Sequence, residues 1–566
     1  MFQAKKILIL RDIILLFTFL ISIALPLFSQ VQEADFFELT NSKHHSPIEL
    51  IERDAISLRS SSPYYTITGY NLSRLGLWTE KKGENSNQNH IEGLSPSTLY
   101  HISVAVETYF STQDTIWDIP FFTRSNSSGD ILVYFNSSIN EDVSNGSAPV
   151  STSGTAIRNA IIQKIDDANV SIDVAAYNIN RNDIVSALNR AANRGVRVRY
   201  IAEGENANTA LNTSLAFNVL KRDDQDGIMH HKFLIIDATE EMDSWVITGS
   251  TNLTTQQIAT DNNNALFIQD QSLAQIFEME FEEMWGSSTA LPNTNLSRFG
   301  QFKNDNTPKW LMVGDLPIEI YFSPSDNTSF HISQAMLNAQ ESISMALLLF
   351  TYNPLANSVI QKHHQGLNVR GLINDINANG SRYQALINNG VNVHPNTVSN
   401  VQLHHKYAII DAESNAESPK VVTGSHNWTN RAENHNDENT LIIHDADIAN
   451  IFRQEFEARW CQMLPDECFV SSIDDLFSSS QSNWYSYPNP TTDVVYIKRK
   501  GETTETSNRI NYSVFNTTGQ LLKSGLRNNG TASPFSIDLS HFPGGSYFVK
   551  IRENGAYQLI QLNVVR

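Results

Sequence analysis

The sequence predicts an α/β protein made of two related, pseudo-symmetric domains, with an all-β domain on each side of them. Two observations predict this class. The pattern H-x-K-x(4)-D, followed by G-S-x-N, occurs within residues 230–252 and again within residues 404–427. Apolar patterns with helical and strand periods alternate around each copy, which indicates βαβ units. At 566 residues the chain is also too long for a single hydrophobic core.

The first predicted repeat spans residues 130–290. Ile157, Ile161 and Ile165 recur at helical spacing, and residues 170–174 then alternate as in a strand. A second helical pattern ends at Gly195, a residue type that suits a helix C-terminus, and a strand pattern follows at once. Helix and strand therefore alternate through this repeat.

The second predicted repeat spans residues 315–465 and shows the same succession. An apolar strand pattern covers residues 343–350, a helical pattern then ends at Gly366, and residues 367–370 resume as a strand. Ile343 and Gly366 are separated by as many residues as Ile172 and Gly195 in the first repeat. Equal spacing at separate landmarks indicates one α/β unit that has been duplicated.

All-β domains are predicted at both ends of this duplicated unit. Short alternating runs and turn residues, rather than helical periodicity, fill residues 31–124 and 483–566. In the first segment, the turn-rich residues 93–100 lead into a strand pattern at 102–106, and this phrase resembles the later strands of a fibronectin type III sandwich. Serine-rich residues 466–482 indicate a linker.

Residues 1–29 have the layout of a secretory signal peptide. Lys5 and Lys6 precede an apolar segment that ends at Phe28, and the small residue Ser29 follows. The apolar segment is shorter than the roughly 20 residues of a membrane-spanning helix, which disfavours a retained anchor. We therefore expect cleavage near Ser29 and export of the chain.

Composition narrows the classes of function. A formal net charge of −20, from 40 Lys+Arg and 60 Asp+Glu, argues against a protein that coats nucleic acid, because such binding needs a basic surface. A local basic site stays open. The only two cysteines, Cys461 and Cys468, could close a small loop in an oxidising compartment, with two free thiols as the alternative.

The doubled motif places chemistry-bearing side chains together. His230 and Lys232 share one face of a strand because side chains alternate along it, and the same holds for His404 and Lys406. If the repeats pack about a twofold axis, these four residues meet in one site. A neutral imidazole could then attack phosphorus while the other, protonated, gives its proton to the leaving oxygen.

The remaining motif residues predict how a phosphoryl group is held. The lysines would bind its non-bridging oxygens together with hydroxyl and amide donors from Ser250, Asn252, Ser425 and Asn427. This chemistry requires no metal or other cofactor. A metal site built from the His-His pairs is disfavoured, because no acidic partner recurs at a ligand spacing in both copies. By alternation, His231 and His405 point to the opposite strand face, which predicts packing roles.

Both copies resemble the paired HKD motifs of the phospholipase D superfamily, whose members resolve phosphodiesters through a phosphohistidine in a two-lobed α/β sandwich. The resemblance covers roughly residues 129–463. It implies that His230 and His404 are the nucleophile and the general acid/base, with His230 favoured as nucleophile, and that their lysines bind phosphate. Asp237 and Asp411 complete the catalytic motifs. Because they end their strands, they are placed to fix neighbouring backbone or the lysines rather than to touch substrate.

The two copies differ at one supporting position. Glu438 follows the second motif where members of this superfamily often carry an acidic residue that orients a catalytic histidine. Asn263 occupies the matching position of the first copy, with Asp261 nearby as a substitute. A carboxylate raises the pKa of a partnered imidazole, whereas an amide orients it without charge, so the two histidines should differ in pKa. Simple drift at a support position is the alternative.

Residues 483–566 resemble the C-terminal sorting domain of type IX secretion cargo. A turn at 516–519 and a glycine-containing turn at 543–546 before a final strand carry this resemblance. Together with a signal peptide it implies a secreted or cell-surface protein of a Gram-negative bacterium, with the type IX secretion machinery as a partner. A carbohydrate- or protein-binding β-module is the alternative. No obligate protein partner is evident, and the duplication predicts a monomer with an internal pseudo-dimer.

The sequence therefore predicts a secreted phosphodiesterase of the phospholipase D superfamily, with phospholipid head-group release as the favoured reaction. A secreted endonuclease and a phosphatidyl transferase with the same site are the alternatives. The net charge of −20 favours a lipid or small diester over nucleic acid. A non-enzymatic adhesion protein is least favoured because both motifs are complete.

Overall fold

A computed structural model of the chain describes residues 94–106, 114–223, 226–413, 418–465, 484–499, 510–517, 521–527, 534–553 and 556–566, and five strands between residues 48 and 92. The predicted signal peptide and the whole of the predicted linker at 466–482 lie outside the described residues, as does Cys468. Cys461 is disulfide-bonded. No helix in the described ranges is long and apolar enough to cross a membrane.

The first repeat is built on a mixed seven-stranded sheet with the order β11-β10-β9-β12-β13-β14-β8. Strands β9, β10 and β11 are parallel, and β12 joins β9 in antiparallel pairing. The strands are β8 (Ile131–Phe135), β9 (Ser171–Ala176), β10 (Arg197–Glu203), β11 (Asn218–Arg222), β12 (Lys232–Ile236), β13 (Trp245–Gly249) and β14 (Asn264–Ile268). The helices are α2 (Gly154–Asp167), α3 (Asn182–Asn193), α4 (Thr255–Ala259) and α5 (Gln271–Trp285).

The second repeat has a corresponding sheet with the order β15-β16-β22-β21-β20-β17-β18-β19. Its strands are β15 (Trp310–Val313), β16 (Leu316–Ser323), β17 (Ser342–Leu347), β18 (Asn368–Ile373), β19 (Asn392–Pro395), β20 (Lys406–Ile410), β21 (Lys420–Gly424) and β22 (Glu438–Ile443). Its helices are α6 (Thr328–Leu337), α7 (Asn353–His364), α8 (Tyr383–Asn388), α9 (Asn430–Asn434) and α10 (Ala446–Met463). The predicted duplication of an α/β unit is confirmed.

Local sequence signals explain where these elements begin and end. The side chain of Asp270 accepts a hydrogen bond from the backbone N–H of Leu273 at the start of α5, and Asp445 caps α10 in the same way. Helix α5 ends at Gly286, whose φ of 79° is in the left-handed region that glycine tolerates. Strand β17 ends at Leu347, before the end of the strand expected at 343–350, because the chain then pairs with other segments: Phe350 bridges to Trp428, and its carbonyl accepts the N–H of Arg382.

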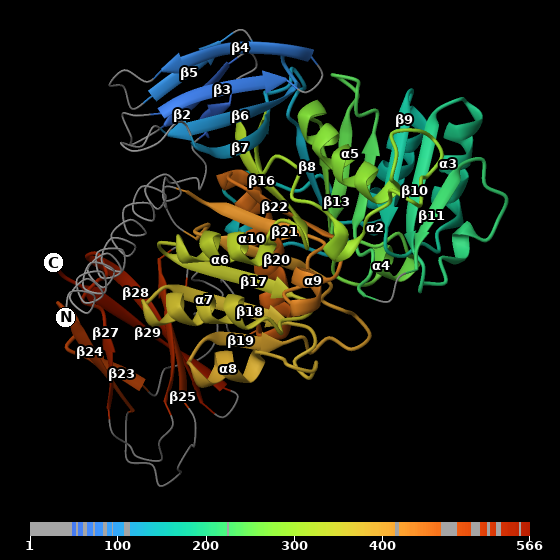
Figure 1. Ribbon diagram of the computed structural model, residues 1–566. Helices are drawn as coiled ribbons and strands as arrows, with labels where there is room; N and C mark the ends of the chain where they lie inside the picture. Colours follow the sequence, from blue (N-terminus) through green and yellow to red (C-terminus); the bar gives the residue numbers. More distant parts are fainter. Residues whose placement is uncertain are drawn as a thin grey trace, which may run out of the picture.

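One hydrophobic core joins the two repeats. It contains Phe233 and Phe277 from the first repeat together with Tyr407 and Phe456 from the second, all fully buried. Burying an aromatic side chain of this size stabilises the fold by about 1.5–3 kcal/mol. Separate clusters lie under α2 and α3 in one repeat and under α6 and α7 in the other. The repeats therefore pack against each other (Figure 1), and strands β12 and β20 both contribute side chains to the shared core.

Small β-domains flank this unit, as predicted. The N-terminal strands form two sheets, one with the order β1-β2-β5 and one with the order β4-β3-β6-β7. They are β1 (Ile48–Ile51), β2 (Ala55–Arg59), β3 (Tyr65–Asn71), β4 (Arg74–Lys82), β5 (Gln88–Glu92), β6 (Leu99–Val106) and β7 (Asp114–Phe122).

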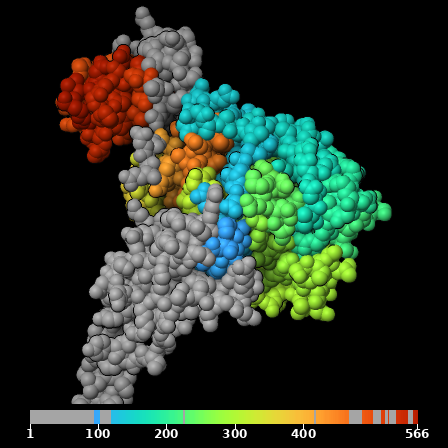
Figure 2. All heavy atoms as spheres, turned by 90° about the horizontal axis from the view of Figure 1, so that it is seen from above, coloured from blue at the N-terminus to red at the C-terminus, as the bar shows by residue number. Residues whose placement is uncertain are grey.

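The C-terminal domain also has two sheets, β23-β24-β27 and β26-β25-β28-β29, and forms a lobe of its own (Figure 2). Its strands are β23 (Trp484–Tyr487), β24 (Val494–Arg499), β25 (Ile510–Asn516), β26 (Leu521–Arg527), β27 (Phe535–Asp538), β28 (Gly545–Glu553) and β29 (Ala556–Val564).

Candidate active site

The two motif strands are joined by reciprocal backbone pairing between the repeats. The N–H of His230 donates to the carbonyl of Asp437 at 3.0 Å, and the N–H of His404 donates to the carbonyl of Asn262, also at 3.0 Å. Each motif histidine is thereby fixed next to the start of a strand from the other repeat. The structure thus brings both motifs together about a pseudo-twofold axis.

His230 is paired with Glu438, which lies at the start of β22. The Nδ1 atom of His230 is 2.7 Å from Oε2 of Glu438, and the carboxylate is fully buried. Burial acts against ionisation, yet His230 and Lys232 lower the pKa of Glu438 to about 2. An ionised carboxylate can only accept a hydrogen bond, so Nδ1 of His230 carries the proton and Nε2 keeps its lone pair. Glu438 therefore selects the tautomer in which Nε2 is nucleophilic.

His404 is paired with Asn263, which immediately precedes β14 of the first repeat. Its Nδ1 lies 2.8 Å from Oδ1 of Asn263. The orientation of this amide is fixed, because its Nδ2 donates to the carbonyls of Gln257 at 2.9 Å and Asp261 at 3.1 Å. His404 therefore also carries its proton on Nδ1, but its partner is uncharged.

The charges around the two imidazoles are therefore unequal. Burial, opposed by Glu438, lowers the pKa of His230 to about 4. Burial and the charges of Lys406 and Lys232 hold the pKa of His404 well below its ordinary value, and no carboxylate is among the largest influences on it. Both histidines are thus neutral at pH 7 in the substrate-free protein.

Lys232 and Lys406 lie beside the histidines with their ammonium groups mutually repelling. Each donates to the carbonyl of its own motif histidine, at 2.7 Å and 2.8 Å respectively. Burial lowers the pKa of Lys232 to about 7, and burial together with the charge of Lys232 lowers the pKa of Lys406 well below its ordinary value. Among the described residues Glu438 acts to raise the pKa of both lysines but forms an ion pair with neither, so the two buried cations favour a bound anion.

Asp237 and Asp411 end strands β12 and β20 and bind backbone. The carboxylate of Asp237 accepts from the N–H groups of Asn169, Val170 and Ser171, each at 2.8 Å. Asp411 accepts equivalent bonds from residues 340–342. We assign both aspartates, each five residues after its motif lysine, to fixing the loops before β9 and β17.

The G-S-x-N residues divide into supports and candidate phosphate ligands. The hydroxyl of Ser250 donates to Oδ1 of Asn263 at 3.0 Å, and Ser425 accepts the N–H of Asn439 at 3.0 Å. Both serines are fully buried. Asn252 and Asn427 are 7% and 8% exposed, and among the described residues their Oδ1 atoms have no hydrogen-bond partner. That Asn252 and Asn427 bind phosphate through their Nδ2 groups stays a prediction, whereas Ser250 bonds the side chain of Asn263 and Ser425 bonds the residue that follows Glu438.

The second histidines of each motif lie in the shared core, in keeping with the packing role predicted for them. His231 Nε2 is 2.9 Å from Glu280, and His405 Nε2 is 3.1 Å from Glu455. Tyr177 was not singled out from the sequence, although its ring lies 4.6 Å from that of His230. Tyr177 and Leu348 occupy equivalent positions in the two repeats, because their backbone N–H groups bond the carbonyls of His231 and His405 respectively. The aromatic residue in one repeat and the aliphatic residue in the other are the sequence difference that could have pointed to Tyr177.

Comparisons with known proteins identify the family of the duplicated unit and of the C-terminal domain. Residues 161–285 and 332–460 each match the family described as "Cardiolipin synthase, PLD-like domain". The duplicated unit belongs to the phospholipase D superfamily. Residues 486–565 match the family described as "Secretion system C-terminal sorting domain", which confirms the predicted sorting domain and a secreted or cell-surface location.

Relatives match only part of the chain. It is 33% identical over 143 residues to the mitochondrial cardiolipin hydrolase of Xenopus tropicalis, covering 25% of this chain and 65% of that protein. The corresponding mouse protein is 32% identical over 145 residues, covering 25% and 62%. The chain thus spans less than two thirds of either relative. The phosphatidylserine synthase of Haemophilus influenzae superposes with a TM-score of 0.43 at 13% identity, over 60% of this chain and 87% of that chain.

Proposed function

We propose that the protein is a phosphoric diester hydrolase that releases the head group from a phospholipid through a phosphohistidine. One observation carries the proposal: two histidines, each with a lysine two residues later, are buried together, with Nδ1 of one against a carboxylate and Nδ1 of the other against an amide oxygen. This arrangement supports the division of roles between nucleophile and acid that phosphodiester cleavage requires.

In the first step, Nε2 of His230 attacks phosphorus and the bond from phosphorus to the leaving oxygen breaks. His404 gives its proton to that oxygen. The imidazole of His230 becomes positively charged as the P–N bond forms, and ionised Glu438, 2.7 Å from Nδ1, stabilises this charge. His230 is therefore the better nucleophile of the two.

His404 must be protonated before it can act as the acid. In the substrate-free protein, burial and the charges of Lys406 and Lys232 hold its pKa low. A phosphodiester anion between the lysines offsets those charges and raises the pKa of His404, so substrate binding itself prepares the acid. In the second step, His404 takes a proton from water, the resulting hydroxide attacks phosphorus, and the P–N bond breaks to give a phosphomonoester and neutral His230.

Two observations favour a phospholipid as the substrate. The curated relatives that match the chain are named cardiolipin hydrolases. The formal net charge of −20 disfavours long polyanions, since nucleic-acid binding draws on counterion release at a basic surface. Phosphatidylcholine and cardiolipin therefore make the primary test substrates.

The proposal is tested by incubating the purified protein, in EDTA, with vesicles of phosphatidylcholine, vesicles of cardiolipin, and single- and double-stranded DNA. We expect phosphatidic acid from at least one lipid. An acid-labile, base-stable phosphoryl adduct on His230 should be trapped by rapid denaturation and located by mass spectrometry. Cleavage of DNA alone would replace the lipid by nucleic acid as substrate, and turnover without an adduct would refute the phosphohistidine.

A further inference from the structure

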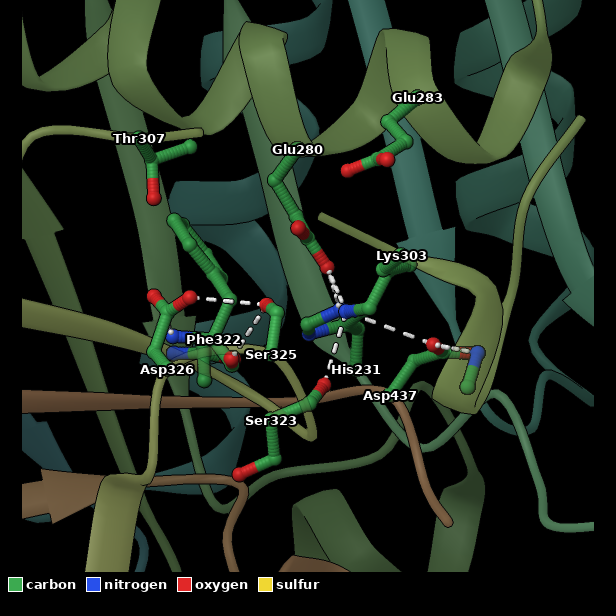
Figure 3. Close-up of polar contacts among 12 residues, drawn as sticks. His231, Glu280, Glu283, Lys303, Thr307, Phe322, Ser323, Ser325, Asp326 and Asp437 are labelled. Atoms are coloured by element: carbon green, nitrogen blue, oxygen red, sulfur yellow. Dashed lines mark hydrogen bonds and ion pairs between the residues drawn. The ribbon is translucent and has the colours of Figure 1, made fainter. Parts of the chain in front are cut away.

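Lys303 lies outside both segments that match the superfamily, in the connector between the repeats. Its side chain is fully buried, and Figure 3 shows it surrounded by Glu280, Ser323 and Asp437. Lys303 forms an ion pair with Glu280, donates to the carbonyl of Ser323 at 2.8 Å, and lies 3.4 Å from Oδ1 of Asp437. A connector residue thus contacts three different elements: helix α5, strand β16 and the loop before β22.

Each of the three residues that Lys303 contacts is bonded to, paired with or adjacent in sequence to a residue of the His230–Glu438 pair or its neighbour His231. Glu280 bonds His231, the residue next to the nucleophile, at 2.9 Å. Asp437 precedes Glu438, and its carbonyl accepts the N–H of His230. Ser323 is the register partner of Glu438 in the pairing of β16 with β22. Lys303 therefore joins three residues that each contact or neighbour His230, His231 or Glu438, on the side of the pair away from the strand face that carries the motif lysines.

The carboxylates around Lys303 keep its buried ammonium group charged. Burial alone would lower the pKa of Lys303, but Glu280 and Asp437 outweigh it and raise the pKa above the ordinary value. Asp437 is also bound by Arg222 at 2.7 Å and by the N–H of Gly300 at 2.8 Å. Two cations face two carboxylates in a buried space, where removing one charge leaves its partner uncompensated.

In the second repeat, the carboxylate that bonds the second motif histidine is paired with a cation that comes from a different element than Lys303. This carboxylate, Glu455, is bound by Arg459 one turn further along α10, at 3.1 Å, and by the hydroxyl of Tyr407 at 2.6 Å. The cation behind His405 thus comes from the same helix as its carboxylate. In the first repeat the cation comes from the connector and reaches across to the second repeat.

We propose that Lys303 is a positioning residue for the reaction, which aligns His230 with Glu438 by fastening Glu280, Ser323 and Asp437 to one another. It does not touch substrate. This inference rests on the proposed role of His230 as nucleophile. It assigns to the connector, and not only to the motifs, a part in building the active site.

The test compares Lys303→Met with Lys303→Arg and with Lys309→Met. Lys309 is the matched control, since it lies in the same connector and pairs with the buried Asp326 at 2.5 Å, but contacts neither Asp437 nor Glu280 in the described structure. For Lys303→Met we expect kcat to fall about ten- to hundredfold, the loss that a misplaced reacting group produces, with KM within about twofold of the wild type. Lys303→Arg should recover part of kcat, and Lys309→Met should keep it while losing stability.

A second readout does not depend on turnover. The proton shared by His230 Nδ1 and Glu438 should give a strongly deshielded proton NMR resonance, assigned by its absence in Glu438→Gln. We expect this resonance in the wild type and in Lys309→Met, and its loss or broadening in Lys303→Met. If the wild type hydrolyses no diester, the proposed function fails, while the resonance still tests the positioning role.

Two results would overturn the inference: wild-type kcat and an unchanged resonance in Lys303→Met, or equal losses of kcat in Lys303→Met and Lys309→Met, which would indicate general destabilisation. Should Lys303→Met not fold, the double variant Lys303→Met/Glu280→Gln removes the cation and its uncompensated partner together. It should fold and show the same loss of kcat, and wild-type kcat there would equally refute the role.

Discussion

Replacing Glu438 by Gln removes the carboxylate that lies 2.7 Å from Nδ1 of His230 and leaves an amide in its place. The first histidine would then have the same kind of partner as His404, whose Nδ1 is 2.8 Å from the amide oxygen of Asn263. The substitution therefore tests whether the charge of Glu438, and not only its hydrogen bond, makes His230 the nucleophile.

The expected loss follows from the charge that develops on the imidazole. A hydrogen bond to a charged partner contributes about 1.5–3 kcal/mol against about 1 kcal/mol for a neutral one, and burial increases the difference. A loss of about 2–3 kcal/mol of transition-state stabilisation lowers kcat/KM roughly 30- to 150-fold. The residues that influence His230 most are Glu438, Lys232 and Lys406, and of these only Glu438 raises its pKa.

The pH dependence has a defined sign. His230 attacks as the neutral base, so kcat/KM should fall as pH drops through its pKa of about 4. In Glu438→Gln this acid limb should move to lower pH, because the charge that raised the pKa is gone. In the wild type, Glu438 has a folded pKa of about 2 against an ordinary value of 4.5, so its contribution to stability is complete above pH 4.5 and is lost as pH falls toward 2.

The assay is steady-state hydrolysis of bis(p-nitrophenyl) phosphate and of phospholipid vesicles across the acid range. Glu319→Gln is a suitable control, because Glu319 makes the same 2.7 Å contact with His444 away from the motifs. That control should keep wild-type rates. An unchanged kcat/KM in Glu438→Gln, or an acid limb that moves to higher pH, would refute the assignment of His230 as a nucleophile supported by charge.

Further predictions concern the other motif residues. His230→Ala and His404→Ala should each abolish phospholipid turnover. With a p-nitrophenyl leaving group, which needs no proton, His404→Ala should still release a burst of nitrophenol. The absence of that burst would contradict the role of His404 as the acid. Lys406→Met should abolish activity. It should also increase the free energy of unfolding of the substrate-free protein by about 1–2 kcal/mol, because a buried cation is removed, and this gain should appear as a higher melting temperature. Asp237→Ala and Asp411→Ala should each destabilise folding by about 2–3 kcal/mol in urea unfolding, since buried N–H groups lose a charged acceptor, and a loss of kcat without destabilisation would place them in catalysis instead.

Most of the architecture could be predicted from the sequence because its signals are local or repeated. The periods of residues 157–174 and the glycine at 195 locate α2, β9, α3 and β10. Equal spacings in the second half made the duplication visible without any structure. The strand order, and the existence of β8 and β16 at corresponding positions of the two sheets, required the structure, because strand pairing joins residues that are distant in the sequence.

The candidate site divides in the same way. His230, Lys232, His404 and Lys406 were found by their motif, and strand alternation put the second histidines in the core. The roles of the motif serines and aspartates could not be predicted from the sequence. These residues bind backbone groups and neighbouring side chains in loops, and the alternation of side chains along a strand gives no information about loop conformation. Nothing in the sequence pointed to Lys303, which belongs to no motif, and the corresponding cation of the second repeat, Arg459, comes from a different element.

The sequence by itself determined that two histidines and two lysines would be presented on strands, and that Glu438 and Asn263 would make the halves unequal. It could not determine which histidine each of them serves. Tertiary structure decided this, because each repeat contributes its support residue to the other: Glu438 reaches His230 and Asn263 reaches His404. The physical reason is the crossed backbone pairing at the interface, which places the start of β22 beside His230 and the start of β14 beside His404.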